Sequence, residues 1–104
     1  MIIQFNTDNH ITGGQEMADE VEAIVEDTLS HFAPRITRVE VHVGDVNAQK
    51  GGGDDIRCSM EARLEGHQPL AAAHQAGTVE EAVDGAAGKL KRSLEHTLGR
   101  LSDR

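Results

Sequence analysis

The sequence predicts an α+β fold of order β-α-β-β-β-α, with a four-stranded sheet and two helices packed on one of its faces. Apolar residues alternate with polar ones in four short segments, whereas they recur three and four residues apart in two longer ones. Three alternating segments follow one another with only loops between them, which is typical of an antiparallel meander. Because each helical segment has one apolar stripe, the helices can cover only one face of the sheet. A chain of 104 residues can bury one core, so we expect a single domain over residues 1–104.

The N-terminal part of the chain predicts a strand, a turn and a helix. Ile3 and Phe5 alternate with polar residues over residues 2–7, and a segment rich in turn-forming residues follows. A helix of about four turns is expected next, and it should end at Ala33 and Pro34. Its apolar stripe comprises Met17, Val21, Ile24, Val25, Leu29 and Phe32.

Two cleanly alternating segments predict neighbouring strands at residues 36–43 and 56–64. Residues 44–55, which connect them, contain three consecutive glycines and predict a long flexible loop. A weaker, Ala-rich strand is expected at residues 70–75, with Pro69 at its start, where no backbone donor is needed. The sheet face away from the helices should stay in water, with Glu–Arg pairs across its strands. That face is expected to display Arg38, Glu40, His42, Arg57, Ser59, Glu61 and Arg63.

The last quarter of the chain predicts a long helix that begins with a capping box. The Thr78 hydroxyl should accept a hydrogen bond from the backbone N–H of Glu81, and the Glu81 carboxylate should accept one from the backbone N–H of Thr78. Apolar residues then recur every three or four positions along the helix. This stripe comprises Val79, Val83, Ala86, Ala87, Leu90, Leu94, Leu98 and Leu101.

Charge divides the chain into an acidic bulk and a basic C-terminal segment. The formal net charge is −8, yet residues 88–104 hold five cations and two acids, which gives them a net charge of +3. The first helix is the opposite extreme, because its polar face holds six acids and no Lys or Arg. A protein with this overall charge repels a polyanion at long range, so any contact with nucleic acid should be local.

The sequence contains no arrangement that predicts an enzyme, a metal site or a cofactor. The histidines lack HExxH or Cys/His spacing, and the glycine run at residues 51–53 joins two strands instead of leading into a phosphate-binding helix. Cys58 falls on the inward side of its strand, where burial raises the pKa of a thiol and weakens its reactivity. Since the chain has one cysteine, no secretory leader and no long apolar run, we expect a cytoplasmic protein without membrane contact or small-molecule substrate.

Three motifs occur in order along the chain. The first is the strand Ile2-Ile3-Gln4-Phe5-Asn6. The second is Leu29-Ser30-His31-Phe32, followed by Arg35-Ile36 and Val39-Glu40-Val41-His42-Val43. The third is Ala82-Val83-Asp84, followed by Lys89-Leu90-Lys91-Arg92-Ser93-Leu94. In their order and spacing, which cover essentially the whole chain, these motifs resemble the ribosome hibernation factors: the short hibernation-promoting factor and ribosome-associated inhibitor A family, also called sigma-54 modulation proteins.

The resemblance implies a fold similar to that of double-stranded-RNA-binding domains. It also implies binding in the channel of the small ribosomal subunit where messenger and transfer RNA would lie. Translation would then stop reversibly in stationary phase or stress, and the protein would perform no chemistry. Lys89 and Arg92 match basic positions of the family, and Arg100 is a further match. The first helix departs from the family pattern, which usually has several lysines there.

These observations leave two main hypotheses of function. The first is a translation inhibitor that contacts ribosomal RNA through cations of the last helix and the open sheet face. Its RNA-binding residues would be Lys89, Lys91, Arg92, Arg100, Arg57 and Arg63. The second is a regulatory domain without RNA affinity, which docks a basic partner such as a ribosomal protein through the first helix. Its docking residues would be Glu16, Asp19, Glu20, Glu22, Glu26 and Asp27. A weaker third hypothesis is a homo-oligomer that pairs the acidic helix of one copy with the basic helix of another.

Overall fold

A computed structural model describes the backbone of residues 1–8, 11, 13–46 and 55–102, with side chains up to residue 99. The elements in chain order are β1 (Ile2–Thr7), α1 (Gln15–Leu29), the 3₁₀ helix η1 (Ser30–Arg35), β2 (Ile36–Asp45), β3 (Ile56–Leu64), β4 (His67–Ala76) and α2 (Val79–Ser102). This order confirms the predicted β-α-β-β-β-α fold. Most of the loop expected at residues 44–55 lies outside the described residues.

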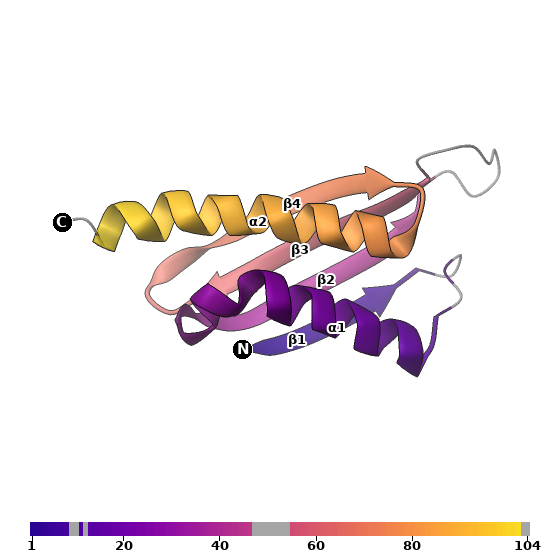
Figure 1. Ribbon diagram of the computed structural model, residues 1–104, viewed down its shortest axis with the longest axis horizontal. Coiled ribbons are helices and arrows are strands. Elements are labelled where there is room, and N and C mark those ends of the chain that lie inside the picture. The colour runs from indigo at the N-terminus through magenta and orange to yellow at the C-terminus, as the bar shows by residue number, and fades with distance from the viewer. Residues whose placement is uncertain (9–10, 12, 47–54, 103–104) are drawn as a thin grey trace.

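The four strands form one sheet with the spatial order β1-β2-β3-β4. β2, β3 and β4 are antiparallel neighbours, as the meander prediction requires, and β1 pairs in parallel with β2. Figure 1 shows α1 and α2 side by side on one face of this sheet, with α1 toward the β1 edge and α2 over β3 and β4. The opposite face has no helix on it in the described part of the chain, so the sheet is covered on one side, as expected.

Apolar side chains between the sheet and the helices form one core. The inward residues of β2 and β3 are buried, except Ile56 at the start of β3, which is half-buried, in agreement with their predicted alternation. The predicted stripe of α2 is buried from Val83 to Leu98, Val79 is half-buried, and Leu101 lies outside the described side chains. α1 contributes Val21, Val25 and Leu29, and η1 contributes Phe32.

The α2 helix approaches β4 closely at Gly85. A Cβ atom built on Gly85 would overlap the imidazole of His74, which therefore occupies the place that a side chain would need. The many alanines of the α2 stripe act in the same direction, because small residues bring a helix axis nearer to the sheet. This close approach places α2 directly beside the outer strand β4.

The first helical segment ends differently from the prediction. The α-helix stops at Leu29, and residues 30–35 form a 3₁₀ helix that contains Pro34. Proline has no N–H and its ring clashes with the carbonyl four residues earlier, so the chain cannot continue as an α-helix through this position. The tighter 3₁₀ turn accommodates Pro34 and still keeps Phe32 in the core.

The strand expected at residues 70–75 begins earlier, at His67, so Pro69 lies inside it instead of at its start. Ala62 pairs with Leu70 and Leu64 pairs with His67, so β4 has one extra residue around Pro69. Such a bulge at an edge strand tolerates a residue without an N–H, because the ladder is interrupted there.

The capping box at the start of α2 is present in a modified form. The backbone N–H of Glu81 donates to Oγ1 of Thr78 over 3.1 Å, as predicted. The Glu81 carboxylate, however, accepts from the Thr78 hydroxyl over 3.0 Å, whereas the prediction had it accept from the Thr78 backbone. One hydroxyl thus serves as acceptor and donor, which a hydroxyl can do without loss.

Candidate nucleic-acid interface

The α1 helix presents an acidic surface to water. Its six predicted docking residues, Glu16, Asp19, Glu20, Glu22, Glu26 and Asp27, are all exposed. Within the described ranges, no Lys, Arg or His comes within ion-pair distance of these carboxylates. The surface therefore keeps its full negative charge, and it lies on the helical side of the molecule.

The predicted cations of α2 differ in their exposure to water. Arg92 and Lys89 are exposed and Lys91 is half-buried, while the side chain of Arg100 is not among the described ones. Glu80, Glu81 and Asp84 are exposed one to three turns earlier on the same helix. The helix is therefore acidic at its beginning and basic in its second half.

Lys89 turns away from the helical surface and toward the sheet. Its Nζ donates to the backbone carbonyl of Ala73 in β4 over 3.1 Å. Because β4 is an edge strand, this carbonyl belongs to a row of groups that no further strand pairs within the described part of the protein. The contact uses one of the three ammonium donors, so two remain for a ligand.

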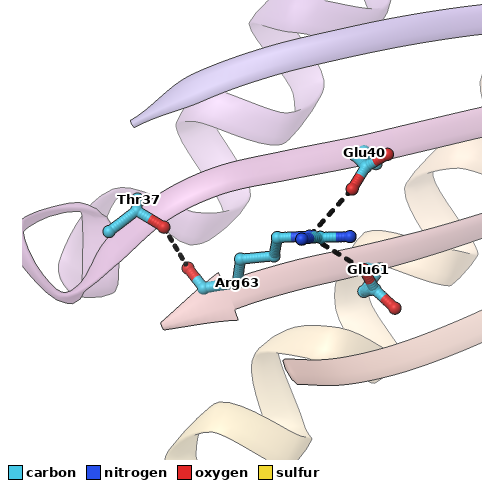
Figure 2. A network of polar contacts seen from close by, with 4 residues as sticks. All are labelled: Thr37, Glu40, Glu61 and Arg63. Carbon is cyan, nitrogen blue, oxygen red and sulfur yellow. Dashed lines mark hydrogen bonds and ion pairs between the residues drawn. The ribbon is translucent and has the colours of Figure 1, made fainter. Parts of the chain in front are cut away.

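Arg63 lies between two carboxylates on the open face of the sheet. Its Nε is 2.9 Å from Oε2 of Glu40 and 3.2 Å from Oε1 of Glu61, as Figure 2 shows. The predicted Glu–Arg pairing across the strands is thereby confirmed. The side chain of Arg63 is 54% exposed, so these ion pairs add little stability, but they neutralise its charge.

Arg57 is in a different situation at the other end of β3. It is exposed, and no carboxylate of the described residues lies within ion-pair distance of it. Arg57 lines a shallow notch at the β4 edge together with Lys89 of α2. Ala73, His74 and Gln75 complete the lining of this notch. Of the six predicted RNA-binding residues, the structure thus brings Arg57 and Lys89 to one site and holds Arg63 in an ion-pair cluster elsewhere.

The open face also has a shallow hollow above β2 and β3, which Asn6, His42, Ser59 and Ala71 line together with the Arg63 cluster. No group of three or more possible metal ligands occurs among the described side chains. Cys58 lies in the core, and burial raises its pKa from 9.0 to about 12. The prediction that the Cys58 thiol is buried is confirmed.

A comparison with protein families shows to which family this chain belongs. The family described as "Sigma 54 modulation protein / S30EA ribosomal protein" matches residues 6–102, nearly the whole chain. The chain belongs to this family. The predicted resemblance to sigma-54 modulation proteins is therefore confirmed.

Two solved structures share their fold with the S30EA-family chain. The N-terminal domain of Thermus thermophilus Protein Y superposes with a TM-score of 0.73 at 14% identity, over 93% of this chain and 99% of that one. A ribosomal subunit interface protein from Coxiella burnetii superposes with a TM-score of 0.71 at 16% identity, over 95% and 99% of the two chains. Among curated proteins, no sequence matches significantly. No helix in the described residues of the S30EA-family chain is long and apolar enough to cross a membrane.

Sequence reasoning missed which cations of this S30EA-family chain lie together. Arg57 and Lys89 are far apart in the sequence, and their meeting depends on the register in which Arg57 pairs with Gln75. The two-residue turn at Glu65 and Gly66 alone would place Arg57 opposite His74, and the extra residue of β4 around Pro69 shifts its partner to Gln75.

Proposed function

We propose that this protein binds the small ribosomal subunit and reversibly inhibits translation in the cytoplasm during stationary phase or stress. The observation that carries the proposal is the family match over residues 6–102. The fold likeness to Protein Y and to a ribosomal subunit interface protein supports it. The protein would act by occupying a site on the ribosome, without chemistry and without a cofactor.

Ribosomal RNA would be contacted by basic side chains of α2 and of the sheet. The exposed residues Lys89, Arg92 and Arg57 support this proposal, and Lys91 and Arg100 extend the same set. Contacts between cations and phosphates release counterions, so affinity should fall steeply with salt, with a slope near −0.9 per phosphate by the duplex estimate. The acidic residues repel RNA at long range, so binding should depend on direct contact between these cations and phosphates.

Co-sedimentation with purified small ribosomal subunits tests the proposal. The protein should pellet with the subunits at low salt and be lost progressively as salt rises. A variant with Lys89, Lys91, Arg92 and Arg100 changed to Gln should stay in the supernatant, and a variant with Glu16 and Asp19 changed to Gln and Asn should still pellet. Absence of pelleting by the unaltered protein even at low salt would refute the proposal.

The acidic surface of α1 favours a second candidate function, docking of a basic protein. Six exposed carboxylates on one helix repel one another, which costs stability unless a partner compensates. Changing Glu20, Glu22 and Glu26 to Lys should then abolish capture of a basic ribosomal protein while sedimentation with small subunits persists. Capture that survives these changes contradicts this second function.

A further inference from the structure

The charges of the molecule are distributed unequally between its two sides. The helical side has the six acids of α1, and the acids at the beginning of α2 add to them. The open sheet face holds Arg38, Arg57 and Arg63 against Glu40 and Glu61. A polyanion is therefore repelled by the helical side and meets less repulsion at the sheet.

The β4 edge is the part of this favourable side that has unneutralised cations from two elements. Arg57 comes from β3 and Lys89 from α2, and both line the same notch. Ser59 pairs with Ala73, so Arg57 is a diagonal neighbour of the residue whose carbonyl holds Lys89. Diagonal neighbours in a sheet lie about 7–8 Å apart, so Arg57 is about that far from Ala73, and the Nζ of Lys89 lies 3.1 Å from the Ala73 carbonyl. The long side chain of Arg57 can therefore reach a phosphate group that also contacts the Lys89 ammonium.

The notch is also the place on the sheet that is farthest from the acids of α1. The α1 helix lies toward the β1 edge, and β4 is the opposite edge, three strand spacings or roughly 14 Å away. The Debye length at physiological ionic strength is about 8 Å, so salt screens most of the repulsion there. The cations of the notch can then act although the whole chain is acidic.

We propose that one backbone phosphate of ribosomal RNA binds in the notch between Arg57 and Lys89. The proposal rests on the proposed function and specifies which surface meets the RNA. The β4 edge and the adjoining open sheet face the RNA, and α1 faces away from it. The Lys89 ammonium is held in position by the Ala73 carbonyl, which lowers the entropy that it loses on binding.

A double-mutant cycle on binding to purified small subunits tests this site. The variants are Arg57→Gln, Lys89→Gln and the pair. Each single change should weaken binding about tenfold, as expected for a hydrogen bond to a charged group. Because both cations serve one phosphate, the double variant should lose much less than the product of the single effects.

The salt dependence of binding to small subunits is a second, independent measurement. Loss of one phosphate contact should make the slope of the double variant shallower by about 0.9, whereas two separate phosphates would give about 1.8. The control cycle combines Arg57→Gln with Lys91→Gln, which lies outside the notch and should give multiplicative effects. Far-ultraviolet circular dichroism of each variant confirms that its fold is kept.

The outcomes separate this inference from the proposed function. If the unaltered protein fails to sediment with small subunits, the proposed function is wrong. If it sediments and the two notch variants bind like the unaltered protein, or their effects multiply, the site is wrong while the function stands. Weakening by both single changes without further loss in the double variant supports the site.

Discussion

Glu40 and Glu61 lie directly opposite each other on β2 and β3, and the guanidinium of Arg63 is within 3.2 Å of both carboxylates. Like charges in this position repel, and Arg63 removes the repulsion. Arg63 itself is directly opposite Arg38, so the same ion pairs also relieve a second unfavourable juxtaposition. These ion pairs thus explain how two glutamates and two arginines, each opposite a like charge on the next strand, can lie together on a small area of the sheet.

Changing Arg63 to Gln should destabilise the protein by about 0.5 kcal/mol, because Glu40 and Glu61 are then left facing each other. Urea unfolding at moderate salt measures the effect. Arg38→Gln is the matched control, since no carboxylate of the described residues pairs with Arg38 and its removal relieves a like-charge contact. Equal destabilisation by both changes would show that the cluster has no special role.

The same cluster predicts how sheet arginines differ in ribosome binding. Arg63→Gln should change affinity for small subunits less than twofold, because its charge is already neutralised. Glu40→Gln combined with Glu61→Gln should instead tighten binding several-fold, since it removes two negative charges and frees Arg63 for phosphate. Sedimentation titrations measure both, and an Arg63→Gln variant as weak as Arg57→Gln contradicts the prediction.

Gly85→Ala should destabilise the protein by about 1–3 kcal/mol, because the new methyl group overlaps the imidazole of His74. Gly88→Ala is the control on the same helix, where the nearest atom is Nη1 of Arg92 at 3.7 Å. That change should stabilise α2 by up to about 1 kcal/mol through helix propensity. Thermal unfolding distinguishes them, and His74→Ala should recover part of the loss in the Gly85→Ala background.

Cys58 should make stability depend on alkaline pH. Burial raises its pKa from 9.0 to about 12, so the folded state keeps the thiol proton at pH values where the unfolded state releases it. Stability from this group is complete below pH 9 and is lost as pH rises toward 12, by about 1.4 kcal/mol per pH unit. Urea unfolding of the protein and of Cys58→Ala between pH 8 and pH 11 measures this effect. The free energy of unfolding should fall more steeply with pH in the unaltered protein than in the variant, and an equal decline in both would contradict the prediction.

The order of elements and the open face of the sheet could be predicted from the sequence because the period of the apolar residues reflects which side chains are buried. The alternation in β2 and β3 and the stripe of α2 are each set by which side chains face the core. Cys58 was placed inside for the same reason. Each of these patterns lies within a single helix or strand, so residues close together in the sequence are enough to recognise it.

The features that escaped prediction depend on contacts between elements or on local backbone choices of similar energy. Pro34 allows either a helix end or a 3₁₀ turn, and Phe32 packing into the core selects the turn. The bulge at Pro69 and the meeting of Arg57 with Lys89 both follow from the β3–β4 register and the position of α2. Such relationships have no periodic signal in the sequence.

The parallel pairing of β1 with β2 has a consequence for how the chain folds. β3 and β4 are joined by a two-residue turn with Gly66 at φ 75°, so this hairpin closes with little loss of chain entropy. Ile2, in contrast, pairs with Arg38 across the whole of α1 and η1. Pairings between distant segments form late because a long stretch of chain must be ordered first. β1 therefore has to wait until α1, η1 and β2 are in place, whereas β3 and β4 can pair as soon as their short turn has formed.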